Sequence, residues 1–277
     1  MLRGIPGSPT NHHGVPYSLT EEFVSVYRMH PLIPDDFSFR SLTDDRELAK
    51  HTLPEVGATH VRERMTEVST PDLLYSFGTS HPGAITLHNF PRFLQEFHRP
   101  SGETIDLAST DILRTRERGV PRYNDFREEM RMPRIRSFDE LTPNREWSEQ
   151  IRRVYDNDID SVDLQVGMYA EPLPPGFGFS DTAFRVFILM ASRRLKSDRF
   201  FTTDFRPEVY TQTGVDWVTH TKMKDVLLRH YPELAPALEG LPNAFVPWNR
   251  VSPDGRRPSK LTNRVEGMKK ALAAINA

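Results

Sequence analysis

Prolines spread along the chain are the feature that most limits what it can fold into. The sequence has 23 prolines and 15 glycines. A proline inside a helix removes a backbone hydrogen bond and clashes with the preceding turn, so long uninterrupted helices are excluded wherever prolines recur. The prolines follow no fixed period, and the sequence contains no internal repeat. The pattern therefore favours short helices joined by irregular, proline-stiffened loops over a repeat array or a disordered tail.

The composition excludes several classes of protein. The 277 residues can bury a substantial core, as one large helical domain or two smaller ones. The net charge of -2 argues against a protein that binds polyanions over its whole surface. The absence of cysteine excludes disulfides, thiol catalysis, Cys-ligated haem and iron–sulfur clusters. No apolar run approaches the ~20 residues of a membrane span, and no signal-peptide segment is evident, so we expect a cytoplasmic or peripheral membrane location.

Hydrophobic periodicity predicts a mainly α fold with very few short strands. Residues 37–42 alternate as a short strand does. We expect loops at residues 1–17 and 243–260. His12 and His13, an adjacent pair in the first loop, lack a neighbouring carboxylate and stay unassigned. The predicted helices cover residues 18–30, 54–68, 70–78, 89–97, 107–118, 123–130, 142–154, 163–172, 181–195, 216–230 and 265–277.

The first predicted helix carries a histidine at its end. Ser18 and Glu21 have the spacing of a capping box, which marks the start of a helix. Tyr27 and His30 then lie one turn apart on the same side. Pro31 disfavours the α conformation for His30, so the helix should end there. An imidazole at such an end can bind a metal through one nitrogen while the other donates a hydrogen bond. On spacing alone, a satisfied core histidine is the more common interpretation.

A second segment is crowded with arginine. Acidic residues alternate with these arginines, so two interpretations stay open. One is a nucleic-acid-binding surface. The other is a set of ion-paired helices with one buried network. The arginines are Arg114, Arg116, Arg118, Arg122, Arg127, Arg131, Arg134 and Arg136.

Both segments resemble motifs of one family. The first is similar to the proximal haem helix in the cyclooxygenase and fatty-acid α-dioxygenase branch of the animal-type haem peroxidases, through Tyr27-x-x-His30-Pro31-Leu32-x-Pro34-Asp35. The second resembles the signature that follows the proximal histidine in that family, with all seven fixed positions present. Those positions are Arg114, Arg116, Gly119, Pro121, Tyr123, Asn124 and Arg127. Residues 163–172 and 198–200 resemble the next landmarks, although packing and helix capping explain them equally well.

The resemblance implies roles for three residues. His30 would be the axial ligand of the iron of haem b, and Tyr27 would carry a radical that removes hydrogen from a fatty acid. Asn124 would accept a hydrogen bond from the far nitrogen of the His30 ring. A neutral amide fixes the ring without making it imidazolate-like, which keeps the iron potential comparatively high. A His30 ring remote from Asn124 would contradict this arrangement.

Within the branch, residues 13–21 and 202–211 are most similar to the plant-type fatty-acid α-dioxygenases and their bacterial relatives. The resemblance implies tyrosyl-radical hydrogen abstraction and O2 addition to a fatty acid, the chemistry of oxylipin formation. Arg206 lies in the segment that supplies the arginine for the substrate carboxylate. A surface ion pair is an equally good interpretation of Arg206. The implied partners are a fatty acid with O2 or hydrogen peroxide, and no nucleic acid.

One departure from the family concerns the distal side of the haem. The distal histidine of the family lies far before the proximal helix, and only 29 residues precede His30 here. We therefore expect one partial domain over residues 1–277: a loop at 1–17, a helical core at 18–230, and a loop with a terminal helix at 243–277. The rest of the domain could belong to a separate chain, and peripheral membrane contact stays open. The alternatives are a general haem peroxidase that uses hydrogen peroxide on small donors and a catalytically inactive helical remnant.

Overall fold

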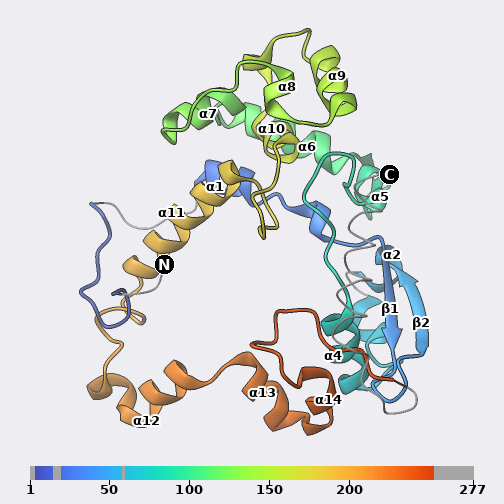
Figure 1. Ribbon diagram of the computed structural model, residues 1–277, viewed down its shortest axis with the longest axis vertical. Helices are drawn as coiled ribbons and strands as arrows, with labels where there is room; N and C mark the ends of the chain where they lie inside the picture. Colours follow the sequence, from blue (N-terminus) through green and yellow to red (C-terminus); the bar gives the residue numbers. More distant parts are fainter. Residues whose placement is uncertain (1–3, 15–19, 58–59, 253–277) are drawn as a thin grey trace. The chain divides into compact units, whose positions relative to one another are not determined.

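The computed structural model describes residues 4–14, 20–57 and 60–252, and the chain divides into two compact units. Unit 1 comprises Met1–Pro34 and Pro82–Thr219, and unit 2 comprises Asp35–His81 and His220–Ala277. Both consist mainly of short helices, so the predicted mainly α class with few short strands is confirmed (Figure 1). We expected a single partial domain over residues 1–277, and the division into two compact units does not test that prediction. Among the described residues, no helix has the length and apolarity to cross a bilayer.

Unit 1 holds the segments that resemble the haem peroxidase motifs. The helix α1 contacts α6, α10 and α11, and α7 contacts α10. Strands β3 and β4 form a two-residue antiparallel pair. The elements are α1 (Glu21–Val26), η1 (His30–Leu32), α5 (Arg92–Gln95), β3 (Phe97–His98), β4 (Thr104–Ile105), α6 (Leu107–Glu117), α7 (Tyr123–Glu129), α8 (Phe138–Leu141), α9 (Arg145–Val154), η3 (Ile159–Ser161), α10 (Leu164–Ala170), α11 (Asp181–Ser197) and α12 (Pro207–His220).

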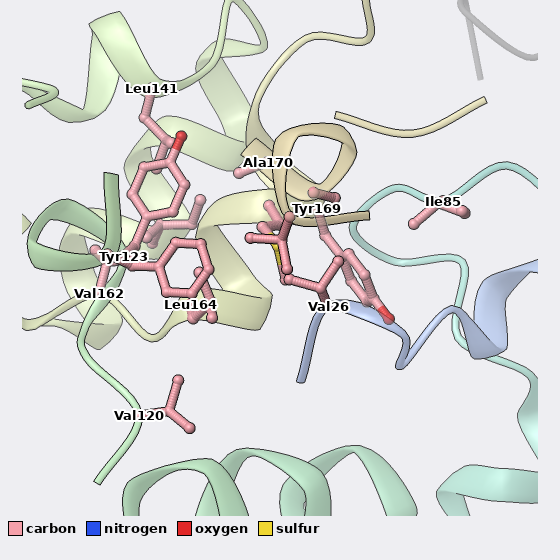
Figure 2. Close-up of a cluster of buried hydrophobic side chains, with 14 of the residues drawn as sticks. Val26, Ile85, Val120, Tyr123, Leu141, Val162, Leu164, Tyr169 and Ala170 are labelled. Carbon is pink, nitrogen blue, oxygen red and sulfur yellow. The ribbon is translucent and has the colours of Figure 1, made fainter. Parts of the chain in front are cut away.

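The core of unit 1 is built from apolar side chains of α1, α7, α10 and α11 with their connecting loops. Val26 of α1 and Tyr169 of α10 lie side by side in this cluster (Figure 2). Tyr123 of α7 is fully buried against Gly167 of α10. A Cβ atom at Gly167 would lie 2.2 Å from the Tyr123 ring, so only glycine permits this close approach of the two helices.

Unit 2 combines a β-hairpin with short helices. Strands β1 (Asp36–Arg40) and β2 (Glu47–Thr52) pair antiparallel, with an irregularity between Phe39 and Arg40. A second core cluster contains Tyr75, Leu234 and Trp248. The remaining elements are α2 (Leu53–Val56), α3 (Val61–Arg64), α4 (Thr70–Thr79), α13 (Met223–His230), η4 (Pro232–Leu234) and α14 (Ala235–Leu238).

Several predicted elements are confirmed. Helices α6 and α7 occur where the sequence places them, and Gly119 adopts φ +70° in the turn between them. The predicted strand at 37–42 is β1, and α11 begins after Ser180, whose side chain accepts the Ala183 N–H. Other predictions are wrong at their ends. The helix expected at 54–68 is broken at Gly57, and the helix expected at 89–97 is the single turn α5.

Two further corrections concern how helices begin. The helix expected at 216–230 is two helices, because the Asp225 carboxylate accepts the Lys222 N–H and starts α13 afresh. The cap of α1 is Thr20, whose hydroxyl accepts the Phe23 N–H, whereas Ser18 lies outside the described residues. The helix expected at 265–277 also lies outside them.

Candidate functional site

The His30 segment differs from the predicted continuous helix. Helix α1 ends at Val26, and Tyr27 is its C-cap. The chain then turns at Met29 before His30 opens the 3-10 helix η1. Pro31 occupies the first turn of η1, where its missing N–H costs no hydrogen bond. His30 therefore starts a new element, and the turn separates it from the Tyr27 helix.

Two neighbouring segments fix the backbone around His30. The Tyr169 hydroxyl of α10 donates a hydrogen bond to the Arg28 carbonyl. The Gly83 N–H donates to the Leu32 carbonyl at 3.1 Å. A side chain at Gly83 would lie 2.0 Å from the Pro31 carbonyl oxygen, so this contact also requires glycine. The turn is thus tied to the unit 1 core from both sides.

Polar contacts connect α1 to α6 along their lengths. Arg114 Nη2 lies 2.9 Å from Glu21 Oε1. The Ser25 and Thr115 hydroxyls are 3.4 Å apart in the buried interface. These contacts place the next turn of α6, which carries Asp111, beside the segment that leads into His30.

Asp111 is the acidic residue nearest to the His30 ring. His30 Nδ1 lies 3.4 Å from Asp111 Oδ2, and Arg28 Nε lies 3.2 Å from Asp111 Oδ1. The Asp111 side chain is 2 % exposed and that of His30 is 20 % exposed. Neither Nδ1 nor Oδ2 is aligned for a hydrogen bond with any described residue. The Phe90 ring lies 5.4 Å from the imidazole and covers part of it.

Burial sets the protonation of this pair. Burial is the largest effect on the pKa of His30 and lowers it; the Asp111 charge raises this pKa, and the Arg28 charge lowers it. Burial is also the largest effect on the pKa of Asp111 and raises it, against the charges of Arg28 and His30, which lower it. The imidazole is therefore biased towards its neutral form, and a neutral imidazole is the form that binds metals. Its second nitrogen, Nε2, makes no hydrogen bond with any described residue.

Tyr27 presents an accessible phenol beside this segment. Its side chain is 58 % exposed. The ring stacks on Phe23 at 5.2 Å and on Phe187 of α11 at 6.3 Å between centroids. Its hydroxyl forms no hydrogen bond with a described residue. These aromatic contacts restrain the ring while leaving its oxygen free to meet another group.

Asn124 does not contact His30, which corrects the predicted arrangement. The Asn124 amide donates to the Ile135 carbonyl at 2.9 Å and to Asp160 at 2.6 Å, and its oxygen accepts the Ile135 N–H at 2.8 Å. Both amide hydrogens are thus used within the α7 region. Asn124 is fully buried and stabilises the segment that follows α7. The side chain that faces the His30 ring is Asp111, which the sequence analysis did not single out. The one sequence signal for it was an acidic residue on the side of α6 that is buried.

Arg206 lies at the start of α12 and is exposed. No ion pair of its guanidinium is found within the described part of the chain, and its role stays a prediction. The structure also joins Arg206 to neither Tyr27 nor His30 by a direct contact.

The arginine-rich segment forms the ion-paired network. Arg116 and Arg122 both pair with Asp163, and Arg127 pairs with Glu171. Asp163 and Glu171 are buried, so these landmarks hold helices together. The interpretation as an internal network therefore agrees with the structure.

Comparison with known proteins decides the family. The sequence profile described as Animal haem peroxidase matches residues 4–244. The chain belongs to the animal haem peroxidase family. Alpha-dioxygenase 1 of Arabidopsis thaliana is 41 % identical over 266 residues, which cover 90 % of this chain and 41 % of the relative. Alpha-dioxygenase PIOX of Oryza sativa is 40 % identical over 264 residues, covering 90 % of this chain and 43 % of the relative.

A solved structure gives the same result for this haem peroxidase chain. The crystal structure of a tyrosine-to-phenylalanine variant of Oryza sativa fatty acid alpha-dioxygenase, with palmitic acid, superposes with a TM-score of 0.82 at 40 % identity. The alignment covers 88 % of this chain and 43 % of that one. The chain therefore spans less than half the length of the relatives it matches. The predicted resemblance to the α-dioxygenase branch is confirmed.

The residues of this haem peroxidase chain can be tested against the group that its family implies. Haem needs one axial donor from the protein. His30 fits, because its Nε2 makes no hydrogen bond with a described residue and its Nδ1 faces a buried carboxylate oxygen that has no hydrogen-bond partner among those residues either. Asn124 does not fit the role of ring orienter, because its amide oxygen accepts the Ile135 N–H and His30 Nδ1 makes no hydrogen bond with it. The described residues contain no cluster of three or more His, Asp or Glu that could hold a bare metal ion.

Proposed function

We propose that the chain is the proximal part of a haem-dependent fatty-acid α-dioxygenase. The observation that carries the proposal is the pairing, on one short segment, of an accessible phenol at Tyr27 with an imidazole at His30 whose Nε2 makes no hydrogen bond with a described residue. The names of the relatives support the same chemistry. His30 is the proposed axial ligand of haem b, and Tyr27 is the proposed hydrogen-abstracting group.

Haem, when bound, supplies the one-electron oxidation that converts the Tyr27 phenol to a tyrosyl radical. The Tyr27 oxygen then takes a hydrogen atom from C2 of the fatty acid, which restores the phenol and leaves a carbon radical. O2 adds to that carbon. The resulting peroxyl group takes back the hydrogen atom of Tyr27, giving a 2-hydroperoxy acid and the tyrosyl radical again. Stacking on Phe23 and Phe187 keeps the ring in one orientation between these steps.

Arg206 is the proposed carboxylate clamp. Its guanidinium is exposed and is not committed to a described acid. A guanidinium binds a carboxylate through two parallel hydrogen bonds, which fixes direction as well as position. Pro207 restricts the backbone at the start of α12, so the arginine projects from a defined element. Holding the carboxylate in one place would present C2 of any chain length to the same phenol.

The first experiment tests haem binding by the 277-residue chain. Haemin is titrated into the wild-type chain, His30→Ala and His88→Ala. His88 is a matched control because it is a histidine of unit 1 whose one hydrogen bond within the described residues is to the Gln150 side chain. We expect a Soret band for the wild type and His88→Ala and its loss in His30→Ala. A chain without a Soret change would be a non-catalytic helical module.

The second experiment tests the chemistry. The haem-loaded chain receives palmitic acid and O2, alone and with the separately expressed part of the Oryza sativa relative that it does not match. Products are analysed by mass spectrometry. We expect a 2-hydroperoxy acid from the wild type and from Tyr210→Phe, and none from Tyr27→Phe, whose Soret band persists. Oxidation of a phenolic donor by hydrogen peroxide without fatty-acid product would favour the general peroxidase alternative.

A further inference from the structure

A groove on the surface of unit 2 is lined mainly by apolar side chains. It lies between α13 and α14 and has a volume of about 420 Å³ (Figure 1). Leu228 and Leu238 line it and also belong to the second core cluster. Ala235 and Pro236 add further apolar surface at its exposed edge. Apolar surface in a groove is more stable when other apolar groups cover it, so this face has the character of a docking site.

The chemistry of the groove favours apolar side chains as its occupant. Lys224 and Glu239 are the two ionisable residues among its described lining. Lys224 Nζ already donates a hydrogen bond to the Leu241 carbonyl at 3.1 Å. Within the described residues, no buried side-chain atom that lacks a hydrogen bond belongs to the lining. A polar ligand would find no buried group to bind there, whereas aliphatic side chains would gain burial.

The chain itself leads to this groove. The Asn249 N–H donates to the Ala237 carbonyl at 3.0 Å, and the Asn249 side-chain amide donates to the Glu239 carbonyl at 2.9 Å. These bonds fix the segment before Ser252 against α14, the helix that lines the groove. Residues 253–264 follow in the sequence and, fully extended, span up to about 40 Å. Residues 265–277 therefore lie within reach of the groove.

The sequence of residues 265–277 has the pattern that such a groove requires. Four aliphatic residues recur at helical spacing and share one side of the helix predicted there. They are Val265, Met268, Leu272 and Ile275. Lys270 lies on the opposite side, and Lys269 borders the apolar side, where its charge complements Glu239 at the rim of the groove. A helix this short, with Gly267 inside it, is marginal in water and needs its apolar side buried.

We propose that residues 265–277 form an amphipathic helix that docks its apolar side into the groove between α13 and α14. The docked helix covers Leu228 and Leu238 and so completes the second core of unit 2. This inference concerns the surface of unit 2 and does not depend on the binding of haem or of a fatty acid.

Hydrogen exchange of the 277-residue chain, followed by mass spectrometry, tests the docking. Ala235→Arg places a long side chain in the groove at an exposed position, and Glu233→Arg is the matched control, because it is exposed on η4 outside the groove. We expect the amides of residues 265–277 to exchange at least about 10-fold more slowly than in a free peptide of that sequence. Ala235→Arg should abolish this protection, and Glu233→Arg should keep it. An unprotected wild-type segment, or protection that survives Ala235→Arg, would overturn the proposal.

Cross-linking gives a second measurement that decides the matter if Ala235→Arg does not fold by circular dichroism. The chain has no cysteine, so two introduced thiols react without background. Ala235→Cys is combined with Leu272→Cys on the apolar side, or with Ala274→Cys on the opposite side as the control. A short bismaleimide should link the first pair within one chain several times faster than the second. Equal rates would show that the apolar side does not face the groove. A product of dimeric size would assign the groove to a second copy, and either result would overturn the proposal.

Discussion

Arg127 and Glu171 form a buried ion pair, with Nη1 of the arginine 3.1 Å from Oε2 of the glutamate. The pair joins α7 to the end of α10. The same Glu171 carboxylate accepts hydrogen bonds from the Tyr123 hydroxyl, and from the N–H and hydroxyl of Thr182 in α11. Helix α7 and the later, consecutive helices α10 and α11 therefore meet at one carboxylate. Two of these helices, α10 and α11, also contact α1, which leads into the His30 segment.

Breaking this pair should destabilise the chain strongly. We expect Arg127→Met to lower the free energy of unfolding by about 3–5 kcal/mol, because it leaves the Glu171 charge buried without its cation. Urea denaturation followed by circular dichroism measures the change. Glu149→Gln is the control, because its pair with Arg145 is on the surface and should contribute less than about 1 kcal/mol. Equal losses in both variants would show that Arg127 is not a buried anchor.

Asp163 should make stability fall in acid. Burial raises the pKa of this carboxyl, but hydrogen bonds from Arg116 and Tyr155 and the charge of Arg122 outweigh burial and lower it. Since the folded pKa lies below the unfolded one, the stabilisation is present at neutral pH. It should disappear as the pH falls below about 5 towards the folded pKa. Urea midpoints measured from pH 7 to pH 3 should fall less steeply in Asp163→Asn, and parallel curves would contradict this.

The close approach of Gly167 to Tyr123 predicts an unusual cost for alanine. Alanine favours a helix over glycine by about 1 kcal/mol, yet Gly167→Ala should destabilise by about 1–3 kcal/mol because its Cβ would overlap the buried ring. Gly214→Ala in α12 meets only ordinary contacts at 3.5 Å and should be neutral or stabilising. Thermal unfolding of the two variants distinguishes them, and a stabilised Gly167→Ala would refute the packing described here.

Arg206 should discriminate acids from esters. In the oxygenation assay, Arg206→Ala should raise the KM for palmitic acid about 10- to 100-fold, the equivalent of one charged hydrogen-bonded pair. Methyl palmitate carries no charge, so its KM should be the same in the wild type and in Arg206→Ala. A similar loss with both substrates would mean that Arg206 supports the fold of α12 and does not bind the carboxylate.

Local signals predicted much of the fold. The Gly119 turn and Pro121 separate α6 from α7 in the sequence, and both helices are present. The alternation at 37–42 likewise predicts β1. The ends of helices were harder to predict, because a helix start depends on which nearby oxygen accepts the unpaired N–H groups of its first turn. Thus Asp225 starts a second helix within the segment expected to be one.

The partner of His30 could not be predicted, for a different reason. The choice between Asp111 and Asn124 depends on whether α6 or α7 lies beside the turn, and the packing of distant elements determines that. Their order in the sequence carries no such information. The motif around Asn124 identified the family, although the amide itself contacts Ile135 and Asp160.

Trp248 packs its indole ring on Gly78 in unit 2, and its backbone N–H donates to the Gly78 carbonyl at 2.8 Å. The chain has three tryptophans, and the other two, Trp147 and Trp217, belong to unit 1. Changing those two to phenylalanine would leave a single emitter, 7 % exposed, in the second core. Its fluorescence would then follow the melting of unit 2 alone, so the order in which the two units unfold can be recorded without attaching a dye.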